Sequence, residues 1–325
     1  MPGAEESEPA RFVVDESSFN FRGLTEEQLT DSMDEFSDAL DELAQGHPVV
    51  VSPWWFDAEC ADGRDLHHVL YEGGTPKAGR DARLRMAKLM DRCPTWDPDL
   101  PGLPDEVAVA EEVPLLALSI GYAWWHAGKG HHTGCLVFPT SARYGWHPVS
   151  AMQVGTGGYA ERDVYFLAGP QGLMEFWRSL FVREEVGEPE FFDRAKKVFP
   201  RLVFANTLTF RRFDGGYAQM RDWVVHALTV VNDHFADALD AHSGIAADIK
   251  AELGRHQLNL SPESPGTRSK PGVMKQRDVE HDGQTYRCEW HAKKEPHRNR
   301  VHFSLPDQRL GDRILIGIFV DHLDT

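Results

Sequence analysis

The residues that could do chemistry gather in the last forty positions, where two segments have the spacing of paired strands. Residues 286–294 and 299–305 alternate apolar and polar side chains, which is the period of a half-buried strand. If residues 295–298 close them into a hairpin, one side collects the apolar pairs Trp290–Phe303, Ala292–Val301 and Cys288–Leu305. The other side collects His291 opposite His302, Lys293 opposite Arg300, and Glu289 and Arg287 beyond them. A slip of one residue would scramble this sorting, so we expect this register.

The polar side of the predicted hairpin has the residue types that cleave a phosphodiester. Cleavage of RNA needs a base for the 2′-hydroxyl proton, an acid for the leaving oxygen, and cations that stabilise the developing charge. Histidine titrates in the useful range. We therefore expect catalysis by His291, His302 and Glu289, and nucleic-acid binding by Arg287, Lys293 and Arg300. The alternative is a solvated sheet face, on which Lys and Arg only discourage aggregation.

The C-terminal sheet resembles the toxin domains of the RelE and HigB type, in which short helices precede an antiparallel sheet whose polar face cuts messenger RNA. The resemblance covers about fifty of the 325 residues, and the matching positions are Arg287, His291, Lys293, Arg300 and His302. It implies a nucleic-acid-engaging protein, a ribonuclease in a toxin-like or phage-defence setting. The chain departs from these domains in its large N-terminal part and in Glu289, which shares the predicted face.

Two further groups of residues have the types found at metal sites. The first group consists of His and Asp, which ligate zinc: Asp65, His67, His68, His126, His131 and His132. The second consists of carboxylates at and after the first predicted strand, of the kind that serve metal-dependent nucleases: Asp15, Glu16, Asp57, Glu59, Glu111 and Glu112. Neither group has the spacing of a known ligand motif, and the cysteines form no CxxC pair. We expect no bound metal and no cofactor, and keep a metal-dependent hydrolase as a second alternative.

The elements that must position these residues begin with a strand–helix–strand unit. A strand is predicted from Arg11, and Thr25 with Gln28 three residues later is the pattern of a helix capping box. Gly46 ends the predicted helix, and a second strand follows at residues 49–52. Such a unit usually builds a parallel pair of strands with a right-handed crossover.

The order of the predicted elements indicates an α/β or α+β fold. We expect a mixed N-terminal and central domain followed by a small C-terminal antiparallel β-sheet. The expected boundaries are a disordered tail over residues 1–10, the mixed α/β domain over residues 11–260, and the sheet module over residues 261–325.

Charge is distributed unevenly along the chain, whose formal net charge is −17. Residues 1–50 carry 13 Asp or Glu against 2 Arg, whereas residues 266–303 carry 9 Lys or Arg against 5 Asp or Glu. The basic end predicts RNA or DNA as a partner, and the acidic N-terminal region predicts a protein partner. The alternative function is therefore a non-catalytic interaction or assembly protein that uses both surfaces.

The composition also predicts where the protein works. No run of apolar residues is long enough to span a membrane, and the N-terminus is acidic and unlike a signal peptide, so we expect no membrane partner. The four cysteines are widely spaced, which is typical of a reducing compartment. We therefore expect a cytoplasmic protein.

Overall fold

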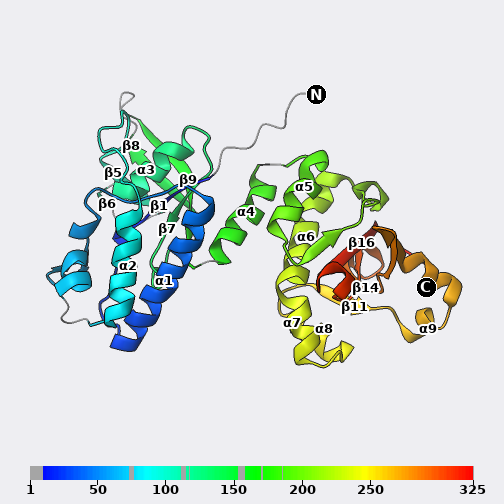
Figure 1. The fold of residues 1–325 in the computed structure, drawn as a ribbon. Helices are drawn as coiled ribbons and strands as arrows, with labels where there is room; N and C mark the ends of the chain where they lie inside the picture. The colour runs from blue at the N-terminus through cyan, green and yellow to red at the C-terminus, as the bar shows by residue number, and fades with distance from the viewer. Residues whose placement is uncertain are drawn as a thin grey trace. The chain divides into compact units, whose positions relative to one another are not determined.

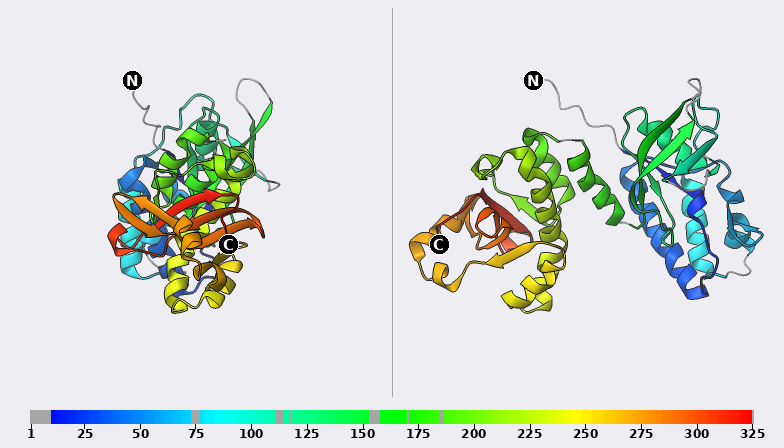
Figure 2. Two further views of the ribbon diagram at one scale, coloured as in Figure 1. Left: turned by 90° about the vertical axis from the view of Figure 1, so that its right-hand side faces the viewer. Right: turned by 180° about the vertical axis from the view of Figure 1, so that it is seen from behind.

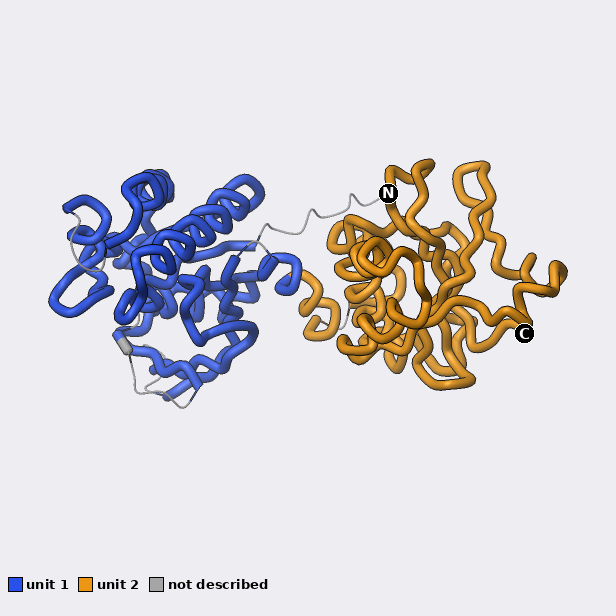
Figure 3. Tube along the Cα trace, turned by 90° about the horizontal axis from the view of Figure 1, so that it is seen from below, with its two compact units in different colours: residues 1–176 blue, residues 177–325 orange. Residues whose placement is uncertain are grey.

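The computed structural model describes residues 10–72, 77–110, 115–116, 118–152, 158–169, 171–184 and 186–324. The chain divides into two compact units, residues 1–176 and residues 177–325 (Figure 3). The prediction of a mixed α and β fold with an antiparallel-rich C-terminal sheet is confirmed. The predicted tail lies outside the described residues except for Ala10, which is buried. In the part of the chain that is described, no helix has the length and apolar character needed to cross a lipid bilayer.

The boundary between the units lies earlier than the sequence analysis places it. Helix α4 (Gln171–Arg183) crosses this boundary. Its residue Phe176 packs against Phe12 and Tyr165 of unit 1, whereas Phe181 belongs to the core of unit 2. The helices between residues 188 and 254 bury apolar side chains against the C-terminal sheet. They therefore belong to the same unit as that sheet and not to a central domain.

Unit 1 contains a seven-stranded sheet with the order β2-β1-β7-β9-β8-β5-β6. Its strands are β1 (Arg11–Val14), β2 (Val49–Val50), β5 (Glu106–Val109), β6 (Leu115–Leu116), β7 (Thr133–Leu136), β8 (Gly145–Met152) and β9 (Tyr159–Leu167). Strands β2, β1, β7 and β9 are parallel, and the remaining pairs are antiparallel. The short strands β3 (Glu59–Ala61) and β4 (Arg64–Asp65) form a separate ladder. Strand β1 pairs in parallel with β2, as predicted from the strand–helix–strand opening, and it also pairs in parallel with β7 on its other side.

Helices pack on both faces of the sheet of unit 1. Helix α1 (Glu26–Gly46) begins with the predicted capping box, in which the Thr25 hydroxyl accepts from the Gln28 backbone N–H and the Gln28 side chain accepts from the Thr25 N–H. It lies beside α2 (Arg80–Arg92), as Figure 1 shows. Helix α3 (Leu118–Ala127) packs on β1, β7 and β9. Val13 of β1 enters the core with α3, and Phe12 points to the other face.

Unit 2 contains a five-stranded sheet with the order β10-β16-β15-β14-β11. The strands of this sheet nearest to the C-terminus are drawn in orange and red in Figure 2. Its strands are β10 (Leu202–Phe204), β11 (Asn259–Pro262), β14 (Trp290–Glu295), β15 (Arg298–Phe303) and β16 (Ile314–Val320), and β12 (Asp278–His281) with β13 (Gln284–Arg287) forms a separate hairpin. Its helices are α5 (Glu188–Val198), α6 (Tyr217–Val230), α7 (Ala236–Ala241), α8 (Ala246–Gly254), α9 (Pro265–Arg268) and α10 (Pro271–Met274). Only β10 and β16 pair in parallel within this sheet, so the remaining pairs are antiparallel.

The predicted register of the β14–β15 hairpin is confirmed. Trp290 lies opposite Phe303, and His291 lies opposite His302. The connecting loop is shorter than predicted, because pairing continues up to residues 296–297. The alternation of the sequence therefore sorts these side chains as expected, with Trp290 and Phe303 in the core formed with α5, α6 and α8.

The opposite face of this sheet is covered as well. A side chain at Gly317 of β16 would collide with the Cys288 sulfur and would lie 2.9 Å from Cγ2 of Val279, which belongs to β12. Only a glycine lets the β12–β13 hairpin approach the sheet this closely. Cys288 packs in this second core with Leu315 and Val279. The predicted pair of Cys288 with Leu305 is therefore wrong.

Candidate functional site

The structure brings His291 and His302 together, but in the interior of unit 2. Their ring centroids are 4.9 Å apart, and their exposed fractions are 4% and 0%. Arg300, on the same side of the hairpin, is 6% exposed. The prediction of a solvent-exposed catalytic face is wrong, because the residues between β11 and β14 fold over it. A polynucleotide cannot reach these two rings in this conformation.

An ion pair between Glu263 and Arg277 lies within this covering segment. Glu263 follows β11, and Arg277 ends a short 3-10 helix before β12. Arg277 is fully buried, and its Nε donates to Oε1 of Glu263 at 2.9 Å. Its two terminal nitrogens donate to the carbonyls of Val273 at 3.0 Å and of Asp324 at 2.7 Å. The guanidinium therefore joins three separate segments of unit 2.

Burial makes both histidines poor proton carriers near neutral pH. Loss of contact with water, together with the nearby His302 ring, lowers the pKa of His291 to about 2. Burial, followed by the charges of Arg277 and Arg300, lowers the pKa of His302 to about 3, against a smaller opposing effect of the Cys288 backbone. Both rings are neutral at pH 7. General acid–base catalysis works best when the pKa lies near the working pH, so this pair does not suit the predicted cleavage.

The remaining residues of the predicted site do not share one exposed face. Glu289 forms an ion pair with Arg268 at 2.9 Å. Arg287 lies in the separate β12–β13 hairpin, where it pairs with Asp278. Lys293 is partly exposed beside the buried Arg300. The roles expected for Glu289, Arg287, Lys293 and Arg300 in catalysis and nucleic-acid binding stay predictions, and the geometry does not gather them around a cleft.

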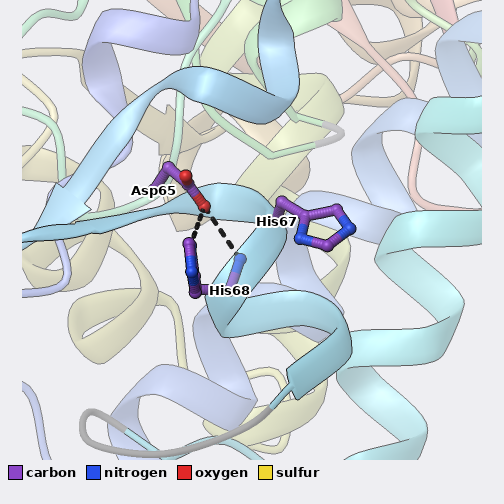
Figure 4. Close-up of side chains that lie close together, drawn as sticks. All are labelled: Asp65, His67 and His68. Atoms are coloured by element: carbon purple, nitrogen blue, oxygen red, sulfur yellow. Dashed lines mark hydrogen bonds and ion pairs between the residues drawn. The ribbon is translucent and has the colours of Figure 1, made fainter.

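A second cluster, of Asp65, His67 and His68, lies on the surface of unit 1. Oδ1 of Asp65 accepts from the backbone N–H of His68 at 2.9 Å and lies 2.6 Å from Nδ1 of the same residue (Figure 4). The His67 ring turns away toward the ring of Tyr71, at 5.2 Å between centroids. The hydrogen bond and charge of Asp65 raise the pKa of His68. This arrangement is a local ion pair that caps a turn.

The histidines that the alternative of a metal-dependent hydrolase would combine in one cluster do not all lie together. His126 and His131 make a second pair, with 2.8 Å between their Nδ1 atoms. Burial lowers the pKa of His126 to about 4, so this ring is neutral at pH 7 and shares a hydrogen bond with its neighbour. Among the described residues, the potential ligand atoms of His67 and His68 lie near Asp65 and not near His126 and His131.

The carboxyl end of β1 carries two buried carboxylates. Asp15 and Glu16 directly follow the strand and are 1% and 3% exposed. The chain leaves β1 toward β2 on one side and later returns to β7 on the other. In open α/β sheets, ligands bind outside the carboxyl ends of the strands where the connections diverge in this way. The two residues therefore lie where such a fold places its ligand.

Asp15 is fully engaged in holding this turn. Its Oδ1 accepts from the backbone N–H of Ser17 at 3.0 Å and from the Ser17 hydroxyl at 2.6 Å. Its Oδ2 accepts from a terminal nitrogen of Arg143 at 3.1 Å. Asp15 thus caps the short 3-10 helix Glu16–Ser18 and positions the residue that follows it.

Glu16, in contrast, has a free oxygen. Its Oε1 accepts from the backbone N–H of Ser119 at 3.1 Å, whereas its Oε2 is buried without a hydrogen-bond partner among the described residues. Burial, together with the neighbouring charge of Asp15, raises the pKa of Glu16 to about 7. A carboxyl of this kind exchanges its proton near neutral pH, which is a property of catalytic and ligand-binding residues.

Glu16 lines a cavity of about 620 Å³, a size typical of small-molecule sites. Trp54 and Trp96 also line it, with 6.0 Å between their ring centroids, and Trp54 is 48% exposed. The described lining residues include no Lys, Arg or His, and they include four acidic residues: Glu16, Asp57, Asp99 and Asp105. Unit 1 as a whole carries 29 Asp and Glu against 12 Lys and Arg. The cavity is therefore aromatic and acidic.

Replacement of Glu16 by glutamine is expected to stabilise the protein at alkaline pH. As the pH rises from about 4.5 to about 7, the unfolded chain loses the Glu16 proton while the folded chain keeps it, so stability falls across this window. Glu16→Gln should therefore raise the free energy of unfolding by about 3 kcal/mol at pH 8 and change it little near pH 4. Urea denaturation at both pH values measures this, with the exposed Glu42→Gln as control. An equal effect at both pH values would contradict the raised pKa.

Sequence reasoning found only part of this site. Of the other carboxylates expected beside Asp15 and Glu16, Asp57 lines the cavity and Glu59 pairs with Arg22. Glu111 and Glu112 lie outside the described residues. Sequence reasoning missed Trp96, Asp99 and Asp105, whose only signal is their place in the proline-rich loop over residues 94–106.

Comparison of the chain with protein-family models, with curated proteins and with solved structures found no match.

Proposed function

We propose that unit 1 binds a small cationic organic molecule in the cavity at the carboxyl end of β1, with Glu16 as the carboxylate that pairs with the charged group. Two observations carry this proposal together: Glu16 lines the cavity, and its Oε2 is buried and lacks a partner among the described residues. A buried polar atom without a hydrogen bond costs free energy, and a ligand that supplies a donor removes that cost.

The other lining residues support a cation as the occupant. Asp57, Asp99 and Asp105 are exposed around the cavity and lower the electrostatic energy of a positive charge inside it. Trp54 and Trp96 offer aromatic faces, which attract ammonium groups and pack against apolar carbon. An amine attached to a flat or apolar group would satisfy the carboxylates and the aromatic rings together.

The same carboxyl group can also move a proton. Because its pKa lies near neutrality, Glu16 can accept a proton from a bound molecule or return one. Arg143 donates to Asp15, which caps the turn that positions Glu16. In binding and in catalysis alike, Glu16 first loses its proton and its carboxylate then pairs with the cationic group of the ligand.

Nucleic-acid binding stays a prediction, and the site geometry favours the cavity over it. Residues 177–325 carry equal numbers of basic and acidic side chains, 22 of each, and the two histidines are buried. Phosphate backbones bind surfaces with an excess of Lys and Arg. The alternative of a non-catalytic assembly protein also stays a prediction.

Binding of benzylamine, compared with benzyl alcohol, tests the proposal. Benzylamine remains charged between pH 6 and pH 8, and its affinity should rise with pH as Glu16 ionises, with release of a proton measurable by calorimetry in two buffers. Quenching of tryptophan fluorescence reports occupancy, because Trp54 lines the cavity. Glu16→Gln should weaken benzylamine binding by about tenfold or more and leave benzyl alcohol unaffected.

The exposed Glu42 of α1 offers the matched control. Glu42→Gln removes the same charge from unit 1 at a position outside the cavity lining, so it should bind benzylamine like the unmodified protein. Equal affinity of the Glu16→Gln and unmodified proteins for benzylamine would overturn the proposal, as would equal binding of the alcohol and the amine.

A further inference from the structure

We propose that Glu263, His291 and His302 form a buried binding site for a transition-metal ion of the zinc class. One ligand atom from each residue lies within 4.8 Å of the other two, and all three residues are buried. This departs from the expectation of a metal-free protein, because the sequence places Glu263 far from the two histidines and only the fold brings it to them.

The spacing of the ligand atoms is too wide for direct hydrogen bonds, and the shorter of the two separations lies closer to the value for an ion than to the value for a bridging water. Oε1 of Glu263 lies 3.6 Å from Nδ1 of His291 and 4.0 Å from Nδ1 of His302. Bonds of about 2.1 Å to a tetrahedral ion would separate two ligands by about 3.4 Å. A water that bridges two groups at about 2.8 Å would hold them about 4.6 Å apart. The observed separations are too long for direct hydrogen bonds and require only a small contraction around an ion.

The ring nitrogens give a second, independent observation. Nδ1 of His291 and both ring nitrogens of His302 are buried without a hydrogen bond of normal geometry to any described residue. Such atoms are costly in a protein interior.

The neighbouring charges decide which ions the site can hold. Arg277 donates through Nε to Oε1 of Glu263, the same oxygen that would bind the ion, so it orients the carboxylate while its charge opposes a cation. Arg300 is nearly buried, and its Nε has no hydrogen-bond partner among the described residues, so its charge opposes a cation. Only ions with strong affinity for imidazole, such as Zn²⁺, overcome this repulsion, whereas Mg²⁺ and Ca²⁺ prefer all-oxygen sites.

The site suits a structural role. His302 is fully buried, so a substrate has no access to an ion bound there. The ligands come from β14, from β15 and from the residue after β11. An ion at this position would cross-link the sheet to the start of the segment that covers it, and its binding energy would add to the stability of unit 2.

Metal analysis of the full-length protein, followed by titration of the chelator-treated protein with Zn²⁺ and Co²⁺, tests the proposal. We expect about one zinc per chain, and visible absorption of the tetrahedral type when Co²⁺ is added. Zn²⁺ should raise Tm and a chelator should lower it, a measurement that needs no variant. Glu263→Gln and His302→Ala should each weaken Co²⁺ binding by more than about tenfold. Arg300→Gln should tighten it, because a repelling charge is removed.

The exposed cluster in unit 1 gives the matched control. His67→Ala removes a histidine from the other group of potential ligands and should leave the metal content and the Co²⁺ spectrum unchanged. A protein that binds neither ion and whose Tm does not respond would overturn the proposal. Loss of binding in His67→Ala in place of His302→Ala would overturn it as well, since the ion would then occupy the surface cluster.

Discussion

Replacement of Trp290 by alanine is expected to lower the free energy of unfolding of unit 2 by about 3–5 kcal/mol. The side chain is 3% exposed, and its ring packs against that of Phe235, with 5.1 Å between centroids. It also faces Phe303 across the β14–β15 pair. Removing the indole leaves a cavity at the point where the sheet meets the helices, and the surrounding side chains can fill it only in part. Urea denaturation followed by circular dichroism measures the loss.

The control for this prediction is Leu305→Ala in the same unit. Leu305 is 40% exposed, so its removal should cost within about 0.5 kcal/mol. His291 is 4% exposed, so His291→Ala should cost more than Leu305→Ala, which it would not do if the residue lay on an open face. If Trp290→Ala and Leu305→Ala destabilise the protein equally, the observed packing of β14 cannot be correct.

Arg277→Met is expected to destabilise unit 2 by about 3–5 kcal/mol. Arg277 is fully buried, and its substitution leaves the carboxylate of Glu263, 4% exposed, without its ion-pair partner. The carbonyls of Val273 and Asp324 lose their donors as well. A buried charge without a partner is among the most destabilising features a protein interior can contain. The same denaturation experiment measures this effect.

The exposed pair of Arg287 with Asp278 supplies the comparison. Arg287 is 46% exposed in its side chain, so Arg287→Met should cost no more than about 1 kcal/mol. The double variant Arg277→Met with Glu263→Leu should recover part of the loss, because it leaves no unpaired carboxylate. Equal losses of stability in Arg277→Met and Arg287→Met would show that the pair of Glu263 with Arg277 does not hold the segment between β11 and β14 on the sheet.

The local features of the fold could be predicted from the sequence. The alternation within residues 290–303 gave the register of the β14–β15 hairpin, because a period of two assigns each side chain to a face. The pattern of Thr25 and Gln28 gave the start of α1, because a capping box depends on residues three positions apart. The alternation and the capping box both depend only on residues that are close together in the sequence.

The exposure of the polar face could not be predicted in this way. The sequence predicts that a polar face with His291, His302 and Arg300 is exposed to solvent, because most polar side chains, arginine above all, lie at protein surfaces. The structure buries the face under the segment with Glu263 and Arg277, whose sequence is rich in Ser, Pro and Gly and resembles a linker. No periodic signal in that segment indicates that it packs on a sheet.

The sequence by itself determined which residues of β14 and β15 share a strand face, where α1 begins, and that α and β elements mix in this acidic chain. Only the tertiary structure decided that the division into units falls within α4, that Glu16 meets Trp54 and Trp96 around a cavity, and that Glu263 reaches the two histidines. The physical reason is the range of the interactions. Periodicity and capping depend on residues a few positions apart, whereas burial and pKa depend on segments that meet only when the whole unit has folded.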